Sequence, residues 1–144
     1  MDMEKLKADL RRDEGLRLVA YKCPAGVWTI GYGHTGAEVL EGMAIDEDIA
    51  EKYLESDIVI ALKPLFQLDW WMDAPEPVRR GLGNMSFNLG WPRLSQFKMM
   101  MQALKAGAWE TAAREALHSK WAEQVGRRAV RIAELFRSAD VGTV

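Results

Sequence analysis

The sequence predicts an α+β fold that is mostly helical, in which a small N-terminal β-sheet lobe is joined by a long helix to a lobe of bundled helices. Two observations lead to this prediction. Between Gly15 and Gly36 the chain is rich in strand-forming residues and glycines, which is typical of a short hairpin or a three-stranded sheet. From Pro75 onward, apolar residues recur at helical spacing with short connectors between the segments, as in a compact helical bundle.

Composition bounds the class of protein. The chain has 144 residues, 49% of them hydrophobic and 28% charged, which is ordinary for one globular domain with a real core. No apolar run approaches the roughly 20 residues of a membrane helix, and the first ten residues are too polar for a signal peptide. We therefore expect a soluble protein that is made in the cytoplasm without a membrane anchor.

Cysteine and histidine are scarce. Cys23 is the one cysteine, so an internal disulfide is excluded, and a lone cysteine is more often a small buried residue than a catalytic one. The two histidines, His34 and His118, are far apart in the sequence, which argues against a zinc site. We expect no metal and no cofactor.

The net charge of −2 is unevenly distributed. Residues 1–60 hold 7 Lys or Arg against 13 Asp or Glu, whereas residues 61–144 hold 12 against 8. This asymmetry favours differently solvated helix faces, although a mildly basic lobe that attracts an anionic polymer is an alternative. Basic residues do not form a stripe with interleaved aromatics, so we expect no nucleic-acid partner.

The order of elements follows from local signals in the first half of the chain. Leu6 and Leu10, four apart among charges, predict a helix over residues 2–12. Asp46 is a candidate N-cap for a connecting helix, which Pro64 should end or bend. We expect one domain, 1–144, in which the helix 1–12 packs with the helical lobe, residues 13–45 form the β lobe, residues 46–68 connect, and residues 69–144 form the helical lobe.

The second half contains several predicted helices. The first starts near Pro75 or Pro77 and ends at Gly90. Ser95 is a candidate cap for the next, which Gly107 closes. Two further helices are expected, one beginning at Trp109 and a last one whose apolar stripe is Val130, Ala133 and Phe136.

One stretch carries the candidate chemistry: DEGLRLVAYKCPAGVWTIGYGHT, starting at Asp13. Glu14 lies where the first helix is expected to end, Cys23 in the first strand or its turn, and Thr29 in the next strand. A hairpin that folds back beside a helix end can bring these three side chains to one edge.

This stretch resembles the active-site segment of the phage lysozymes, glycoside hydrolase family 24, the muramidases of T-even and lambdoid phages. The family has a Glu, eight residues, an Asp or Cys, five residues and a Thr, and the spacing from Glu14 through Cys23 to Thr29 is the same. The flanks EGLRLVAY and TIGYGHT are also similar. The resemblance implies a lysozyme-like fold and a monomeric endolysin that hydrolyses the β-1,4 bond between N-acetylmuramic acid and N-acetylglucosamine in peptidoglycan, causing lysis of the host cell.

Glycoside cleavage explains the residue types. An acid must protonate the leaving oxygen, and a water or nucleophile must reach the anomeric carbon. Glu14 is the candidate acid, and Thr29 can hold a water on the opposite side; the resemblance implies that this water attacks with inversion. Cys23 departs from the Asp-bearing members of the family. Its thiol can position the water, or act as a base when ionised.

The resemblance extends along most of the chain. NMSFNLG, at residues 84–90, is similar to the family's cleft-lining helix end, which implies that Phe87 and Asn88 bind substrate. RRAVR, at residues 127–131, is similar to the last core helix, which implies that Arg128 lies near Glu14. Taken alone, Phe87 can equally be a core residue and Arg128 a surface ion-pair residue.

His34 is a candidate base, but a structural role is favoured. Asp57 occupies the position of the family's acidic partner for this histidine. An ion pair between them should raise the pKa of His34 and lower the pKa of Asp57.

Two other functions remain open. A lytic transglycosylase uses one Glu on the same bond but makes an anhydro sugar without water, and a non-catalytic peptidoglycan-binding module would not need Glu14. A helical adaptor would leave the glycine-rich hairpin unexplained. For the hydrolase, we expect release to the cell wall to need a separate membrane-permeabilising protein.

Overall fold

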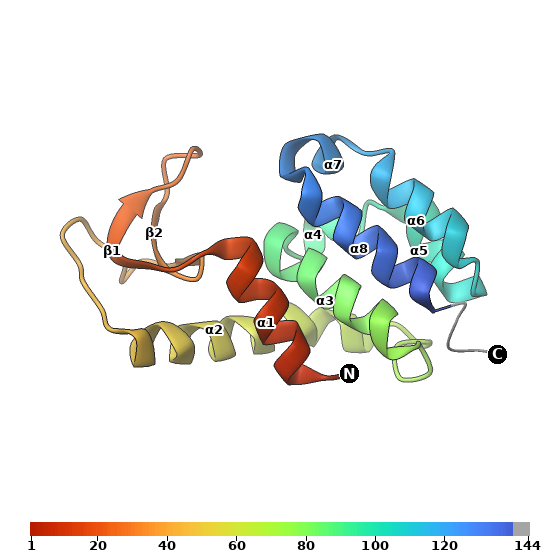
Figure 1. Ribbon diagram of the computed structural model, residues 1–144, viewed down its shortest axis with the longest axis horizontal. Coiled ribbons are helices and arrows are strands. Elements are labelled where there is room, and N and C mark those ends of the chain that lie inside the picture. Colours follow the sequence, from red (N-terminus) through yellow and green to blue (C-terminus); the bar gives the residue numbers. More distant parts are fainter. Residues whose placement is uncertain (140–144) are drawn as a thin grey trace. The chain divides into compact units, whose positions relative to one another are not determined.

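The structure is a computed structural model that describes residues 1–139. Its backbone contacts divide the chain into two compact units. The sheet unit comprises residues 4–60, and the helical unit comprises residues 1–3 with the described residues from 61 onward. The predicted α+β, mostly helical fold is confirmed (Figure 1). The helix α1 groups with the sheet unit, and its expected packing against residues 69–144 stays a prediction.

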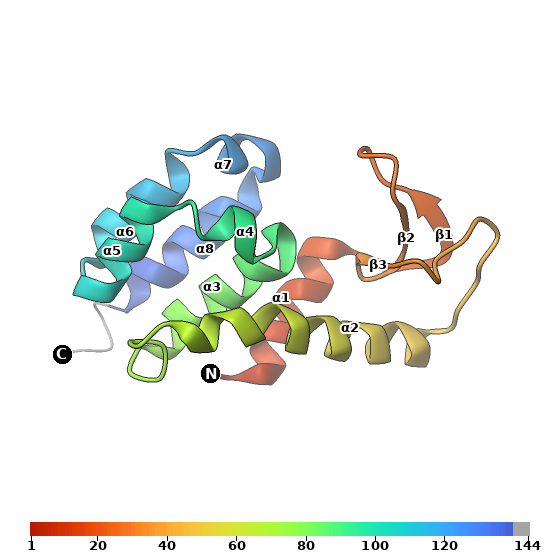
Figure 2. The ribbon, with the colours of Figure 1, turned by 180° about the vertical axis from the view of Figure 1, so that it is seen from behind.

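The sheet unit begins with α1 (Met3–Glu14), whose Leu6 and Leu10 are buried as their spacing predicts. Three antiparallel strands follow, β1 (Arg17–Lys22), β2 (Trp28–Gly31) and β3 (His34–Thr35), in the order β1-β2-β3. Figure 2 labels the short β3 beside β2. Thr29 lies in the central strand, opposite Tyr21 on one side and Thr35 on the other. The sheet therefore fixes Thr29 from both sides.

The helix α2 (Glu47–Leu62) supports this sheet unit. Asp46 caps it as predicted, because its Oδ1 accepts a hydrogen bond from the backbone N–H of Ile49 at 2.9 Å. Arg11 of α1 forms a two-bond ion pair with Glu51 of α2, at 2.6 and 2.9 Å. After Leu62 the chain tightens into the 3-10 helix η1 (Lys63–Gln67), where Pro64 cannot continue the α-helical hydrogen bonding.

The helical unit contains α3 (Glu76–Leu89), α4 (Trp91–Leu94), α5 (Lys98–Ala106), α6 (Trp109–Leu117), α7 (Lys120–Val125) and α8 (Arg127–Ser138). α8 packs against α3, α6 and α7 (Figure 1). Where α3 meets α8, a Cβ at Gly81 would lie 2.8 Å from the ring of the fully buried Phe136. The glycine therefore allows the two helices to approach closely.

Two expectations for this unit were wrong, and two short helices were missed. Ser95 does not cap α5: it follows α4, and its hydroxyl donates to the Pro92 carbonyl at 3.0 Å, while Phe97 occupies the N-cap position. Val130 is half-exposed, whereas the other two residues of the predicted stripe, Ala133 and Phe136, are buried, together with Ala129 and Ile132. The short helices α4 and α7 were not predicted. Among residues 1–139, none of the helices combines the length and the apolar character needed to cross a membrane.

Candidate active site

Glu14 is the last residue of α1. The helix stops there because Gly15 adopts a left-handed conformation, with φ of 72°, and donates its N–H to the Arg11 carbonyl at 3.0 Å. The half-buried Glu14 carboxyl lies against Gly33, in the turn between β2 and β3, where a Cβ would overlap it. Gly33 also has a φ of 75°, which residues with a side chain rarely adopt, and its missing Cβ leaves room for this carboxyl group.

Cys23 and Thr29 lie side by side at the end of the β1–β2 hairpin. Cys23 opens the turn: its N–H donates to the Val27 carbonyl at 3.0 Å, and its carbonyl accepts from the Gly26 N–H at 2.8 Å. Thr29 is only 4% exposed, and its hydroxyl donates to the Val27 carbonyl at 3.0 Å. The hydroxyl has one proton, which can be donated either to this carbonyl or to the Cys23 thiolate, and its oxygen keeps lone pairs that can accept a hydrogen bond from water.

The surroundings of Cys23 lower the pKa of its thiol and so favour the ionised form. Backbone N–H groups of Val27 and then Ala25 lower its pKa, the Thr29 hydroxyl adds to this effect, and burial opposes it. Hydrogen bonds donated to a thiolate stabilise the charge, so a larger fraction is ionised near neutral pH than in a free cysteine. One compact unit thus contains a carboxyl group, a hydroxyl oxygen that can accept a hydrogen bond from water, and a thiol with a lowered pKa.

His34 and Asp57 are brought together. The His34 Nδ1 lies 2.8 Å from an Asp57 carboxylate oxygen, and its Nε2 lies 2.6 Å from a carboxylate oxygen of Glu38. The imidazole also stacks on Tyr53, with ring centroids 3.9 Å apart and planes inclined by 6°. Glu38 and Tyr53 were not found from the sequence, although the i, i+4 spacing of His34 and Glu38 was a signal that could have indicated the first.

The pKa shifts of this cluster correct one expectation. Burial alone would lower the pKa of His34, but the hydrogen bonds and charges of Asp57 and Glu38 outweigh it and raise the pKa, as expected. The pKa of Asp57 is also raised, contrary to the expectation from ion pairing. Burial is the largest influence on it and exceeds the opposing effect of His34, while the charge of Glu38 raises it further.

The remaining candidates belong to the helical unit. Arg128 is buried, and its Nε donates to the Asn84 side-chain oxygen at 2.8 Å. The Asn88 side-chain oxygen accepts a hydrogen bond from the indole N–H of Trp121 at 2.7 Å. Phe87 is half-buried on α3. Asn84 and Trp121 were not predicted. The expected proximity of Arg128 to Glu14 joins two units and stays a prediction.

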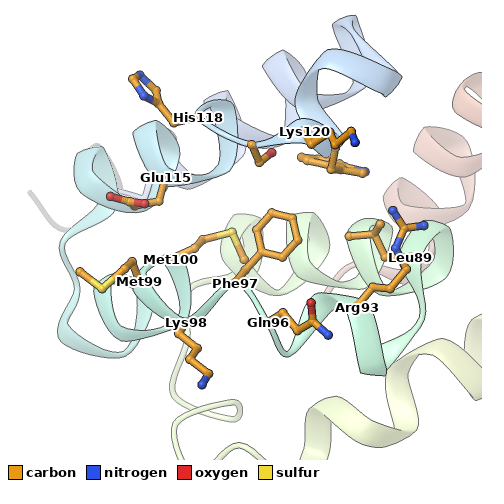
Figure 3. Close-up of a pocket in the computed structure, with 12 residues that line it drawn as sticks. Leu89, Arg93, Gln96, Phe97, Lys98, Met99, Met100, Glu115, His118 and Lys120 are labelled. Carbon is orange, nitrogen blue, oxygen red and sulfur yellow. The ribbon is translucent and has the colours of Figure 1, made fainter.

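A cavity of about 410 Å³ opens in the helical unit (Figure 3). Leu89, Phe97, Met100 and Trp121 form apolar walls, with Arg93, Lys98 and Lys120 also in the lining. None of the sequence-predicted site residues lines it. Within residues 1–139, no group of three or more His, Cys, Asp or Glu residues is arranged to hold a metal ion.

Comparison with known proteins decides the family. The family model described as phage lysozyme matches residues 11–137, a range that contains Glu14, Cys23, Thr29 and Arg128. This chain belongs to the phage lysozyme family. It is therefore a glycoside hydrolase of the lysozyme type, which degrades peptidoglycan, and the resemblance found in the sequence is confirmed.

Individual relatives agree with the family model. An endolysin of Acyrthosiphon pisum secondary endosymbiont phage 1 is 30% identical over 83% of this chain and 80% of its own length. A probable T4-type lysozyme of Dictyostelium discoideum is 25% identical over 94% of this chain and 95% of its own length. An endolysin of Bacillus phage B103 is 34% identical over 79% of this chain, which corresponds to 43% of that protein.

Proposed function

We propose that this lysozyme is a muramidase: it hydrolyses the β-1,4 bond between N-acetylmuramic acid and N-acetylglucosamine, with Glu14 as the general acid and Thr29 and Cys23 as the groups that hold and activate water. The observation that carries this proposal is the pairing of Cys23 with the buried Thr29 in the same compact unit as the Glu14 carboxyl. A carboxyl group for the leaving oxygen and a separate water-holding pair are what hydrolysis of a glycoside requires.

Glu14 gives its proton to the glycosidic oxygen as the bond from that oxygen to the anomeric carbon breaks. Water held by the Thr29 oxygen forms the new bond to that carbon from the opposite side, which inverts its configuration. The proton that this water loses passes to the Cys23 thiolate. Solvent then returns one proton to Glu14 and removes one from Cys23, so the enzyme is restored.

Phe87, Asn88 and Arg128 are proposed to bind the glycan strand from the helical unit. The family match covers all three residues. Arg128 is oriented by the hydrogen bond that it donates to Asn84, and Asn88 by the one that it accepts from Trp121. His34 and Asp57 are proposed as a structural pair, supported by their 2.8 Å contact.

We infer that the enzyme acts as a monomer, is made in the host cytoplasm and lyses the host after a separate membrane-permeabilising protein gives it access to the cell wall. Expression with and without such a permeabilising protein tests the last step: lysis should need both. Lysis by the enzyme alone would contradict it.

Digestion of purified peptidoglycan in water enriched in heavy oxygen tests the chemistry. Mass spectrometry should find new reducing ends on N-acetylmuramic acid, each carrying one heavy oxygen atom. Anhydromuramic ends without the heavy atom would identify a lytic transglycosylase instead. Binding without any cleavage would identify a non-catalytic module, and reducing ends on N-acetylglucosamine would show that the other glycosidic bond is cut.

A further inference from the structure

The imidazole of His34 bridges two carboxylates that come from different parts of the sheet unit. Asp57, on α2, faces Nδ1 at 2.8 Å, and Glu38, in the segment between β3 and α2, faces Nε2 at 2.6 Å. Tyr53, also on α2, stacks on the ring. These are the titratable groups that face the ring in the described structure, and both ring nitrogens are therefore engaged with acceptors.

The number of protons on His34 decides whether both contacts persist. An imidazolium has two N–H donors and can donate to both carboxylates, whereas a neutral imidazole has only one N–H. After deprotonation, one nitrogen would present a lone pair to a carboxylate at hydrogen-bonding distance, which is repulsive. One of the two contacts must then open unless a carboxyl group takes up a proton.

Of the two contacts, the one between Glu38 and His34 can open more easily. The Glu38 side chain is 53% exposed against 21% for Asp57, so water can replace the lost hydrogen bond at Glu38 more easily. The Glu38 carboxylate also folds back over Gly36, where a Cβ would lie 2.5 Å from it. The Val39 N–H donates to the Gly36 carbonyl at 3.1 Å, which closes the same turn. The contact with His34 therefore adds a second anchor to the turn formed by residues 36–39, which the buried Val39 side chain also holds.

This contact between Glu38 and His34 lies next to the proposed catalytic groups. His34 directly follows Gly33, against which the Glu14 carboxyl lies. His34 also pairs with Ile30, and the next residue, Thr35, pairs with Thr29. Any loosening of the segment that follows His34 is thus transmitted through one or two residues to the backbone that holds Glu14 and Thr29.

We propose that Glu38 is a positioning residue that acts as a pH-dependent latch: protonated His34 holds it and thereby fixes the β3 segment beside Glu14 and Thr29, and neutral His34 releases it. The inference rests on the proposed function for its link to catalysis, while the latch itself concerns only the sheet unit. The upward shift of the His34 pKa is consistent with a latch that stays closed to a higher pH than an ordinary histidine would allow.

Glu38→Gln tests the latch by NMR titration. Glutamine keeps the length of the side chain and can donate to neutral His34 or accept from protonated His34, so its contact no longer depends on the proton. In the wild-type protein, exchange of the Val39 amide, corrected for its intrinsic pH dependence, should accelerate roughly five- to tenfold as His34 deprotonates, as expected for loss of one hydrogen bond. In Glu38→Gln that acceleration should be absent, and the His34 midpoint should fall by roughly half to one pH unit, because an opposite charge has been removed.

Glu41→Gln is the matched control, because it removes the same charge from the same connecting segment at an exposed position. It should leave the His34 midpoint and the Val39 exchange unchanged. An unaltered His34 midpoint in Glu38→Gln, or Val39 exchange that does not follow the His34 titration in the wild-type protein, would overturn the latch.

Measurements of activity distinguish a positioning role of Glu38 in catalysis from a contact that only stabilises the fold. The ratio of kcat/KM for Glu38→Gln to that of the wild type should rise across the His34 midpoint, because only the wild type opens there; the ratio cancels the titration of Cys23, which both proteins share. A ratio that is constant with pH would refute the positioning role. A wild-type protein that does not cleave peptidoglycan at all would contradict the proposed function, and the NMR result would still decide whether the latch exists.

Discussion

The interactions that hold the elements together within the sheet unit differ in one respect from those within the helical unit. Both units have an apolar core: Leu6, Leu10 and Ile30 are almost fully buried in the sheet unit, as Phe136, Leu82 and Met100 are in the helical unit. Ion pairs also occur in both, Arg11 with Glu51 in the sheet unit and Arg137 with Glu110 in the helical unit. The sheet unit differs in holding a buried histidine, His34, between the carboxylates of Asp57 and Glu38, which outweigh the effect of burial and raise its pKa. Stability of the sheet unit should therefore depend on pH more strongly than that of the helical unit, which should depend mainly on packing.

Truncation of Phe136 is expected to have the largest effect on stability. Phe136→Ala removes a fully buried ring that contacts Gly81, so the helical unit should lose about 3–5 kcal/mol of unfolding free energy. Chemical denaturation at several pH values measures it, and the loss should be nearly the same at each. A strong pH dependence would contradict the contrast between the two units.

Asp57→Asn should have the next largest effect, and here pH matters. The pKa of His34 is raised above 6.5, so its contribution to stability is fully present below that pH and is lost as pH rises through the folded value. The pKa of Asp57 is also raised, from 3.8, so ionisation of this carboxyl in the folded protein is itself unfavourable as pH rises. The variant should lose about 1–3 kcal/mol where His34 is charged, and less above the His34 midpoint.

Denaturant titrations of wild type and Asp57→Asn on both sides of the His34 midpoint check this expectation. Loss of the Asp57 charge should also lower the His34 pKa. A cost that grows as His34 becomes neutral would contradict the account of the pair.

Substitution of Cys23 should have a smaller effect, and it should change the reaction rate rather than the stability. Because the pKa of its thiol is lowered, wild-type activity should rise with pH over a range below the ordinary thiol titration. Cys23→Ser should lose this rise and roughly tenfold in kcat/KM, about the value of one lost hydrogen bond or charge contact. Cys23→Asp should remain clearly active. If Cys23→Ala were fully active and the wild type were insensitive to alkylation, the thiol would contribute only to packing and not to catalysis.

The exposed ion pair should contribute least. Arg11 and Glu51 have side chains 36% and 32% exposed, so Glu51→Gln should cost about 0.2–1 kcal/mol. The pKa of Glu51 is lowered by its hydrogen bond with Arg11, so this contribution is present above pH 4.5 and is lost as pH falls through the folded value. Thermal unfolding in low and high salt measures it, and the difference between variant and wild type should shrink in high salt. A difference unaffected by salt would argue against an electrostatic origin.

Local signals were sufficient for much of the fold. The buried Leu6 and Leu10 and the cap formed by Asp46 depend only on residues within a few positions of each other, and both were predicted. The helix α7 was missed because it is a single short segment, although Ser119, which caps it, was a readable signal. Ser95 was misassigned because the same residue type closes α4 by bonding backward to Pro92.

The site was predictable in its members but not in its surroundings. The spacing of Glu14, Cys23 and Thr29 is a property of the sequence. The contact of Glu38 with His34 depends on how the chain turns back at Gly36, and the stacking on Tyr53 depends on where α2 lies beside the strands. The predicted direction of the Asp57 pKa shift was wrong, because the shift is decided by burial of the carboxyl group, and burial does not follow from an expected ion pair.

Glu14→Gln tests most directly the claim that the chemistry belongs to the carboxyl group at the end of α1. Glutamine keeps the size of the side chain but cannot act as a carboxylic acid. We predict that kcat/KM on purified peptidoglycan falls by at least about 10²-fold, with thermal unfolding unchanged, while Glu4→Gln at the exposed start of the same helix keeps wild-type activity. Wild-type rates in a folded Glu14→Gln protein would contradict the account.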